Sequence, residues 1–478
     1  MRSGSGARAL TWLIVVLVGL VLVDVLVEGW VLALLTRPGG GPPAWPKLVK
    51  NGLFLALAAL TVASVLVRRR WRDFTTRADL ALLVLALVMV VAGVVGGSPP
   101  RLIGQALFVY FRGVIVFYAL RAADPPGPWL RRIGWVLAGI IGLNVAVALV
   151  QMLVGIPAFT AVGWTDLTWA KIDRAQGLLT HPNHLGHVLG LALLGLLAAM
   201  VTRPRVRWPW WAAFAAGALA LSATQSRESV LACAVGAGLL WLLARGGRRI
   251  LAAVAVLLLC AAAQVLLRPA NLAEWQRRMS GVVNAVAPTT PPASPAPHPS
   301  GGAKVGTAKP KPPQREIRIL MYQQGLRLLW HEPILGYGVG QFGGIVAQEN
   351  NPNWNLNPRF GPGGFDRHGF VSKQVDSFWL HLVVETGLLG LLAYLCWLYL
   401  LIRPLLPGAR RRPDRPADPY AAWAVVALAF VVQVAFLSAS LEDEVLPALL
   451  FALLGVAWTR TRRQPTPPVA EPELVAAA

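Results

Sequence analysis

Long apolar runs recur along the whole chain, and they constrain its fold more than any other feature. A helix needs about 20 apolar residues to cross the roughly 30 Å core of a bilayer, and many of these runs approach or exceed that length. Of the 478 residues, 56% are hydrophobic, and a soluble domain has no need of so many such runs. The sequence therefore predicts an all-α integral membrane protein with about 12 transmembrane helices. They are expected near 9–33, 48–67, 78–96, 103–121, 132–154, 182–201, 208–223, 228–244, 249–267, 378–402, 420–438 and 445–459.

Positive charge is distributed unevenly between the loops. The net charge of +22 could indicate a nucleic-acid partner, but membrane proteins collect Lys and Arg in their cytoplasmic loops. With a cytoplasmic N-terminus, the inner segments hold 24 Lys and Arg residues and the short outer loops hold seven. The charge therefore predicts a multi-pass protein with a retained first helix and both termini cytoplasmic, and no nucleic-acid partner.

A long hydrophilic loop, 268–377, interrupts the series of helices. Its segment 288–313 carries nine prolines and cannot bury a core, so we predict a disordered spacer. An amphipathic helix is predicted at 315–330, on the membrane surface. Its apolar face would carry Ile319, Tyr322, Leu326 and Leu329. No internal repeat relates two halves of the chain, which disfavours a two-half transporter. The predicted organisation is a nine-helix region at 1–267, this extracytoplasmic loop, a three-helix region at 378–459 and a cytoplasmic tail at 460–478.

Polar residues gather where three helices begin on the predicted outer face. The segments are DRAQGLLTHPNHLGH at 173–187, TQSRES at 224–229 and VDSFWLHLVVETG at 375–387. A helix N-terminus presents free N–H groups and the positive end of a dipole, so it readily binds anions. The three segments together predict an extracytoplasmic active site that contains Arg174, Arg227 and Asp376.

Each charged residue near these segments also has a simpler interpretation. Arg174 could anchor the protein to lipid head groups, and Arg227 could pair locally with Glu228. Asp376 could cap the N-terminus of its helix. Arg318, on the predicted amphipathic helix, could be a solvated charge.

Three histidines in the first segment suggest a metal site, because histidine is a common zinc ligand. His184 and His187 share a helix face, but His181 would point away from them, and no acidic or cysteine ligand is near in the sequence. We therefore predict no metal and no cofactor. His181, Asn183 and His184 are instead candidates for hydrogen bonds with a substrate or within the structure.

Other charged residues lie inside or between the predicted helices. Arg112 lies about nine residues inside the fourth helix, where a charge costs about 2.5–3.5 kcal/mol, so it should face a polar interior. His381 and Glu385 are four residues apart, and we predict a buried hydrogen bond between them. The acidic run 442–444 is predicted to be a solvated loop.

Arginines at helix N-termini suit a diphosphate at the bilayer surface, because a guanidinium binds phosphate bidentately and keeps its charge. The obvious membrane-embedded diphosphate is a polyprenyl carrier. Transfer of a glycan from such a carrier needs a group that stabilises the leaving diphosphate and a base that takes the proton of the acceptor hydroxyl. The arginines are candidates for the first role and Asp376 for the second.

Four motifs carry a resemblance to a known family. They are R-x-x-G-L-L-x-H-P-N-H-L-G at 174–186, T-x-S-R at 224–227, R-x-x-x-Y-x-x-G-L ending in P-I-L-G-Y-G-V-G-Q-F at 318–342, and V-D-S-F-W-L-x-x-x-x-E-T-G-L-L-G at 375–390. In this order, and with the long loop before the final helices, they resemble the O-antigen ligase and O-antigen polymerase family of bacterial glycan-transferring membrane enzymes. The resemblance covers roughly residues 160–400.

The resemblance implies a GT-C-like fold in the bacterial plasma membrane. It also implies a metal-independent, inverting transfer of a glycan from undecaprenyl diphosphate to a glycan or lipid acceptor. Arg174, Arg227 and Arg318 fall on the family's arginine positions. The residues expected to bind substrate are His181, Asn183, His184, Glu228, Tyr322 and Glu385.

One departure from the family pattern bears on the reaction. Ligases typically have His-Asn where this chain has Asp376-Ser377. A carboxylate can act as a base, but it cannot become a cation that helps to bind diphosphate. Polymerase-like and exopolysaccharide members of the family more often look this way, so the resemblance favours polymerisation of O-antigen or exopolysaccharide chains. The alternatives are a ligase that uses a lipid or other acceptor, a flippase for lipid-linked glycans, and a glycan-binding scaffold that would tolerate loss of the charged residues.

Overall fold

The computed structural model describes residues 3–36, 43–266, 317–365, 374–413 and 415–463. The described residues form helices, turns and loops and contain no strand. The predicted spacer 288–313 and most of the predicted tail 460–478 lie outside the described residues.

Ten helices in the described part of the chain are long and apolar enough to cross a membrane, so the predicted all-α membrane fold is confirmed and the chain is a multi-pass membrane protein. Each coincides with a predicted span. They are α1 (Ser3–Leu35), α2 (Trp45–Val67), α3 (Arg77–Val95), α4 (Pro100–Ala123), α5 (Gly127–Val154), α8 (Pro182–Thr202), α10 (Arg227–Ala244), α11 (Gly247–Leu266), α15 (Phe378–Ile402) and α18 (Val445–Arg463).

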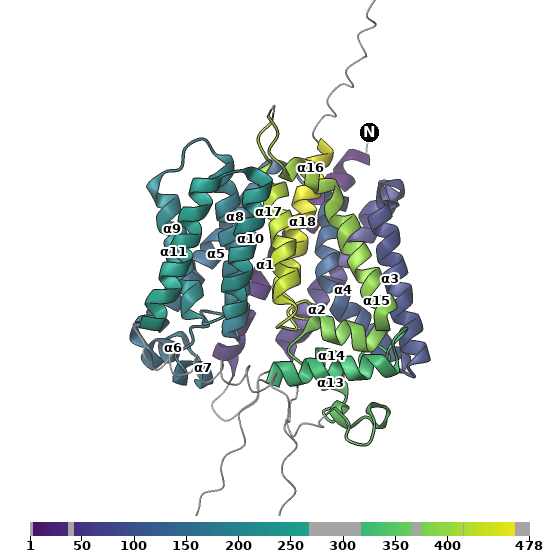
Figure 1. Cartoon of the computed structure of the whole chain (residues 1–478). Coiled ribbons are helices and arrows are strands. Elements are labelled where there is room, and N and C mark those ends of the chain that lie inside the picture. The colour runs from purple at the N-terminus through teal and green to yellow at the C-terminus, as the bar shows by residue number, and fades with distance from the viewer. Residues whose placement is uncertain (1–2, 37–42, 267–316, 366–373, 414, 464–478) are drawn as a thin grey trace, which may run out of the picture.

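The other two predicted spans are short helices: α9 (Trp208–Ala223) has the predicted bounds, and α17 (Pro419–Val434) ends before the predicted residue 438. They have 16 residues each, or about 24 Å of helix, against a bilayer core of about 30 Å. Both lie in the bundle beside the longer helices (Figure 1). Beyond the end of α17, the carbonyls of Ala435 and Ser438 accept the backbone N–H of Phe378 at 3.0 and 3.1 Å. The chain leaves the helix there and holds the first residue of α15.

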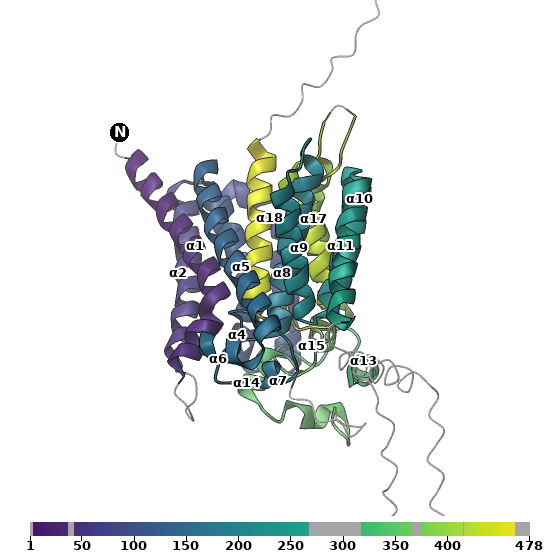
Figure 2. The same cartoon turned by 90° about the vertical axis from the view of Figure 1, so that its left-hand side faces the viewer.

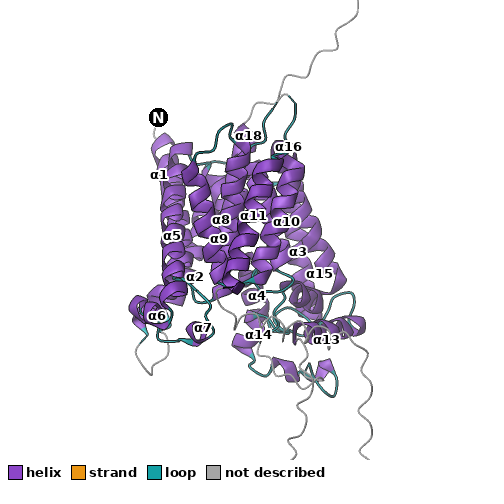
Figure 3. Ribbon diagram, turned by 60° about the vertical axis from the view of Figure 1, so that its left-hand side comes forward, coloured by secondary structure: helices purple, strands orange, loops and turns teal. Residues whose placement is uncertain are grey.

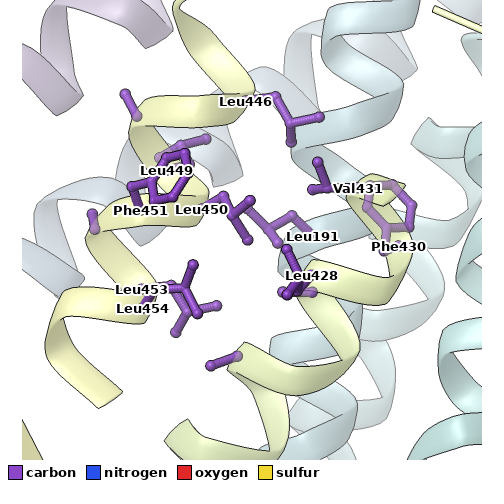
Figure 4. Packing of buried hydrophobic residues seen from close by; sticks show 14 of the residues in the cluster. Leu191, Leu428, Phe430, Val431, Leu446, Leu449, Leu450, Phe451, Leu453 and Leu454 are labelled. Carbon is purple, nitrogen blue, oxygen red and sulfur yellow. The ribbon is translucent and has the colours of Figure 1, made fainter. Parts of the chain in front are cut away.

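The centre of the bundle is a contact between α8, α17 and α18. Leu191 of α8, Leu428 of α17 and Leu450 of α18 lie close together there and are buried (Figure 4). α4 packs closely on α18 because Gly113 faces Pro447, and a Cβ on Gly113 would lie only 2.5 Å from the Pro447 Cβ. Small residues allow such close packing between membrane helices.

The two ends of the bundle differ. α1 begins and α18 ends at the same end, as expected if both termini lie on one side of the membrane (Figure 1). Short helices lie at the opposite end (Figures 2 and 3). They are α6 (Ile156–Val162), α7 (Thr168–Lys171), α13 (Ile317–His331) and α14 (Ile345–Asn350). The other short elements are α16 (Leu406–Ala409) and 3-10 turns at Trp71–Phe74, Trp354–Leu356, Pro358–Phe360 and Arg403–Leu405.

α13 lies across the end of the bundle, as the predicted amphipathic helix should (Figure 1). Its predicted apolar face is only partly correct. Tyr322 and Leu329 pack against the buried cluster, but Leu326 is exposed, and Leu320, Gln324 and Leu328 are buried in addition. The reason is the contact with α15. Gly325 lies against Leu380, where a Cβ would come within 2.6 Å of a methyl group, so the helix is turned to bring its smallest residue to the crossing point.

A glycine-rich loop joins α13 to a break in α15. Inside α15, Gly387 has a φ of 65°, a left-handed conformation that favours glycine. At this break the N–H of Leu388 donates to the Pro333 carbonyl at 2.8 Å, and the N–H of Tyr337 donates to the Val384 carbonyl at 2.9 Å. A Cβ on Gly387 would lie 2.1 Å from the Ile334 carbonyl oxygen. The P-I-L-G-Y-G-V-G-Q-F motif thus fixes α13 to α15.

Candidate active site

The candidate site lies at the end of the bundle opposite the termini. α8, α10, α15 and α18 all begin at this end, and α13 crosses it (Figure 1). The N-termini of four helices therefore point toward one face of the protein, as predicted for the first three.

The loop that carries Arg174 is held by two polar side chains of α5. Gln151 Oε1 accepts the backbone N–H groups of Gln176 and Gly177 at 3.1 and 2.8 Å, and Asn144 Oδ1 accepts that of Leu178 at 2.9 Å. Asn144 and Gln151 are buried, and the sequence analysis did not identify them. Their spacing of seven residues, which places both on one face of an otherwise apolar helix, was the available signal.

Arg174 joins the first polar segment to the second. Its Nε donates to the Thr224 carbonyl at 2.9 Å, and its terminal nitrogen donates to Asn183 Oδ1. The guanidinium also lies over the ring of Trp169, 5.3 Å from the centroid. These contacts bind the α9–α10 turn, and hence the region of Arg227, to the start of α8. Arg174 is therefore built into the protein, and the interpretation as a lipid anchor does not account for its contacts.

The start of α10 packs directly on α8. A Cβ on Gly186 of α8 would lie 2.6 Å from the Ser226 Cβ, so only glycine permits this approach. Arg227 is the first residue of α10 and is partly exposed, whereas Glu228 is buried in the first turn.

Two histidines line the start of α8. His181 is the N-cap, and its Nδ1 accepts the backbone N–H of Asn183 at 3.0 Å, so this nitrogen is unprotonated. Burial, with the nearby His184, Arg174 and Arg318, lowers the pKa of His181 to about 3.

His187 does not belong to this polar surface. It is fully buried inside α8, and neither ring nitrogen has a hydrogen-bond partner among the described residues. Among those residues there is also no cluster of three His, Cys, Asp or Glu side chains that could hold a metal ion.

The third polar segment is tied to α13. Arg318 Nε lies 3.5 Å from Asp376 Oδ2, and the Asp376 side chain is 50% exposed. The Tyr322 hydroxyl is 2.6 Å from Ser377 Oγ, which also accepts the Leu380 N–H as the N-cap of α15. The interpretation of Asp376 as the N-cap is wrong, because Ser377 has that role. The Asp376 carboxylate remains accessible at the surface.

The acidic run before α18 is buried, so the prediction of a solvated loop is wrong. Asp443 Oδ2 lies 3.7 Å from His184 Nε2, and burial raises the pKa of Asp443 to about 6. Glu444 contacts Lys50 at 2.7 Å and Arg112 at 2.8 Å. Burial alone would raise the pKa of Glu444, but these two cations lower it to about 2. The prediction that Arg112 faces a polar interior is confirmed.

The predicted pair of His381 and Glu385 does not form. His381 instead pairs with Glu442, whose other carboxylate oxygen accepts the Ile345 N–H at 2.8 Å. Glu385 is fully buried and accepts the N–H of Phe342 at 3.0 Å and the hydroxyl of Tyr110 at 3.3 Å. The carboxylates of Glu442 and Glu385 both hold the segment after α13. Each lies far in the sequence from the residue that it binds, so the four-residue spacing did not predict these contacts.

Chemically, the face combines cations, a carboxylate and hydrogen-bonding side chains. Arg174, Arg227 and Arg318 carry positive charge at or beside helix N-termini, where an anion is stabilised. Asp376 is an exposed base, and His184 is a second candidate base held by Asp443. Such a surface can bind an anionic group and accept a proton from a hydroxyl.

Comparison with known families gives one match. Residues 212–395 match the family model described as O-antigen ligase. This range contains Arg227, α13 and the start of α15, whereas Arg174 and α18 lie outside it. A search among curated proteins found no match. The family model and the multi-pass helical fold support a glycan-ligating role in the membrane, and residues 212–395, less than half of the chain, are similar to the O-antigen ligase family.

Proposed function

We propose that this protein polymerises a cell-surface polysaccharide, O-antigen or exopolysaccharide, by transferring a glycan from undecaprenyl diphosphate to an acceptor sugar. The reaction takes place at the extracytoplasmic face of the bacterial plasma membrane, and both termini are cytoplasmic. The observation that carries the proposal is the pair of contacts made by Arg174 with Thr224 and Asn183. They bring the start of α8, which follows Arg174, and the start of α10, which carries Arg227, together at one surface.

The reaction is a single displacement. The acceptor hydroxyl oxygen attacks the anomeric carbon, the bond from that carbon to the diphosphate oxygen breaks, and the configuration inverts. Arg174, Arg227 and Arg318 bind the diphosphate and stabilise the negative charge that it gains. Because three guanidinium groups supply this stabilisation, the reaction needs no metal.

Asp376 takes the proton of the acceptor hydroxyl. Its half-exposed carboxylate, 3.5 Å from Arg318, supports this role because it is accessible and lies beside a proposed diphosphate ligand. His181, Asn183, His184 and Tyr322 would hydrogen-bond the sugars. Glu228 and Glu385 are buried, so we propose that they act by positioning α10 and the glycine-rich loop.

A second candidate base is His184, because Asp443 lies 3.7 Å from its Nε2. The two candidates are separated by variants. If Asp376 is the base, Asp376→Asn loses transfer by about 100-fold or more and His184→Gln retains most of it. The opposite pattern would assign the base to His184.

The arginine roles are tested by Arg174→Lys and Arg227→Lys. Each should reduce transfer by about 10- to 100-fold without loss of folded protein, because lysine keeps the charge but loses the bidentate fork. Arg131→Lys, at an exposed position near the start of α5, is the matched control and should retain activity. Normal activity in both site variants would contradict the proposed diphosphate site.

A ligase acting on a lipid or other acceptor is the closest alternative, since the family match itself describes ligases. The polymerase proposal rests on Asp376-Ser377 in place of His-Asn. The products distinguish the two reactions, because a polymerase makes a ladder of lipid-linked glycans and a ligase makes one product that requires an added acceptor. Movement of glycan across vesicles without any transfer would indicate a flippase.

A further inference from the structure

A basic cavity lies at the end of the bundle that carries the termini, away from the candidate active site. Its volume is about 740 Å³, and it is bounded by the ends of α8 and α10, the start of α11 and the loop residues 411–413 and 415–417. Seven arginines line it. Among the seven are Arg203, Arg245, Arg248, Arg249, Arg411 and Arg412.

Backbone hydrogen bonds fix the walls of this cavity. The N–H of Arg411 donates to the Leu243 carbonyl at 2.9 Å, which fastens the loop to the end of α10. Arg412 and Arg415 exchange backbone hydrogen bonds at 2.9 and 3.3 Å, so the loop forms a closed turn. On the opposite wall, Arg249 donates to the carbonyls of Met200 and Pro204 at 2.7 and 2.8 Å and ties α11 to α8. The backbone that carries these arginines is therefore fixed around the cavity.

Tryptophans place the cavity at the level of a membrane surface. The Arg203 guanidinium stacks on Trp210, 3.9 Å from the ring centroid. Trp241 is half exposed, and its indole nitrogen lies 3.4 Å from a Cβ position on Gly247, a residue of the cavity wall. Trp208, at the start of α9, is also exposed. Tryptophan is enriched where membrane helices meet the head-group layer.

The topological bias of membrane proteins accounts for arginines in these loops but not for their convergence. An excess of arginines in the cytoplasmic loops requires only scattered side chains. Arg131 and Arg132, which are exposed near the start of α5, are examples. Here arginines from three separate loops line one cavity, and its volume lies within the size range of small-molecule sites, about 300–1,000 Å³. A single phosphate would fill only a small part of it.

We propose that this cavity binds the head group of an anionic phospholipid that carries two phosphodiesters. Arginine recognises phosphate oxygens bidentately, and basic pockets between membrane helices suit such head groups. The acyl chains would extend along the apolar sides of the helices, beside Trp241 and Trp208. The bound lipid would hold the α16–α17 loop to the ends of α8 and α10.

The test uses the full-length protein in detergent and native mass spectrometry. Cardiolipin, the two-phosphate probe, should bind at least about tenfold more tightly than phosphatidylglycerol, which has one phosphate. The triple variant Arg248→Gln, Arg411→Gln, Arg412→Gln should lose this binding by at least about tenfold. The control Arg8→Gln, Arg131→Gln, Arg132→Gln removes three exposed arginines elsewhere and should retain it.

Equal cardiolipin binding by the two triple variants would overturn the proposal, because the attraction would then be general. Equal affinity of the unaltered protein for the two lipids would also overturn it. Inorganic pyrophosphate should not displace the lipid at millimolar concentration. Displacement at concentrations equal to those of the lipid would mean that the cavity binds a soluble polyanion instead. A thermal unfolding measurement on each variant verifies that the protein is folded.

Discussion

At the scale of single residues, the acidic run before α18 is the main connection between separate parts of the protein. Glu442 contacts α15, Asp443 contacts His184 on α8, and Glu444 contacts Lys50 and Arg112 on α2 and α4. The charge of Glu444 is stable inside the protein because two cations lie within reach, and Glu442 and Asp443 each lie beside a histidine. The candidate active site is therefore supported by a layer of ionisable side chains from Glu442, Asp443, Glu444 and their partners, which we call the ionic layer.

Replacing Glu444 with Gln should be strongly destabilising. Lys50 and Arg112 have side chains only 8% exposed. Lys50 keeps its pair with Glu28 at 2.8 Å, but Arg112 loses the carboxylate that lies 2.8 Å from it, which leaves its buried charge uncompensated. The expected loss is about 3–5 kcal/mol of unfolding free energy, measured as a lower thermal midpoint in detergent. The control is Glu349→Gln, which removes a surface pair with Lys47 and should cost at most about 1 kcal/mol. An equal fall in thermal midpoint for the two variants would contradict the stabilising role of the ionic layer.

His181 should make stability depend on pH. Its pKa is lowered to about 3 in the folded protein, from about 6.5 in the unfolded chain, so the unfolded state takes up the proton first as pH falls. The contribution of His181 is complete above pH 6.5 and is lost progressively between pH 6.5 and 3. His181→Asn keeps an N-cap acceptor without titrating. The variant should therefore show a smaller fall in thermal midpoint between pH 7 and 5 than the unaltered protein. An equal fall in thermal midpoint between pH 7 and 5 for the variant and the unaltered protein would exclude this contribution of His181.

At the scale of elements, the break in α15 determines where α13 lies. The glycine-rich loop enters the break at Gly387 and bonds to both of its sides. As a result, Arg318 and Tyr322 reach Asp376 and Ser377. The conformation of one glycine thus controls the geometry of the third polar segment.

Gly387→Ala should disrupt this connection. A Cβ would meet the Ile334 carbonyl at 2.1 Å, and the positive φ is itself unfavourable for alanine. We expect at least about 1–3 kcal/mol of destabilisation and a loss of transfer activity. Gly104→Ala in α4 is the control, since nothing lies within 4 Å of its Cβ position, and it should be neutral or slightly stabilising. A stable, active Gly387→Ala protein would show that the break is not required.

The sequence predicted the positions of the helices better than the contacts between them. Apolar length located each of the ten helices that are long enough to cross a membrane in the described part of the chain, because such a helix must satisfy its own backbone hydrogen bonds in the bilayer. It could not show that α17 ends early to receive Phe378, nor that the run 442–444 is buried, because both depend on partners far away in the chain. The three polar segments were located by their charge at helix starts. The support from Asn144 and Gln151 was missed, because it depends on how α5 packs.

At the scale of the whole molecule, the two ends of the bundle present different chemistry. The end opposite the termini gathers arginines with a carboxylate and histidines, whereas the end with the termini gathers arginines around a cavity. If both termini are cytoplasmic, the first end faces outward. A periplasmic reporter enzyme fused after the last residue should be inactive, and one inserted within 288–313 should be active. The reverse pattern would contradict the proposed orientation.

The most direct test of the central claim is transfer by the purified protein in nanodiscs, with native undecaprenyl-diphosphate glycan and a metal chelator present. The account predicts a ladder of longer lipid-linked glycans, with one undecaprenyl diphosphate released for each bond formed. Formation of the ladder should slow by about 10- to 100-fold in Arg174→Lys and in Arg227→Lys and keep its rate in Arg131→Lys. Folded, unaltered protein that forms no glycosidic bond with this donor, with or without an added acceptor, would contradict the account.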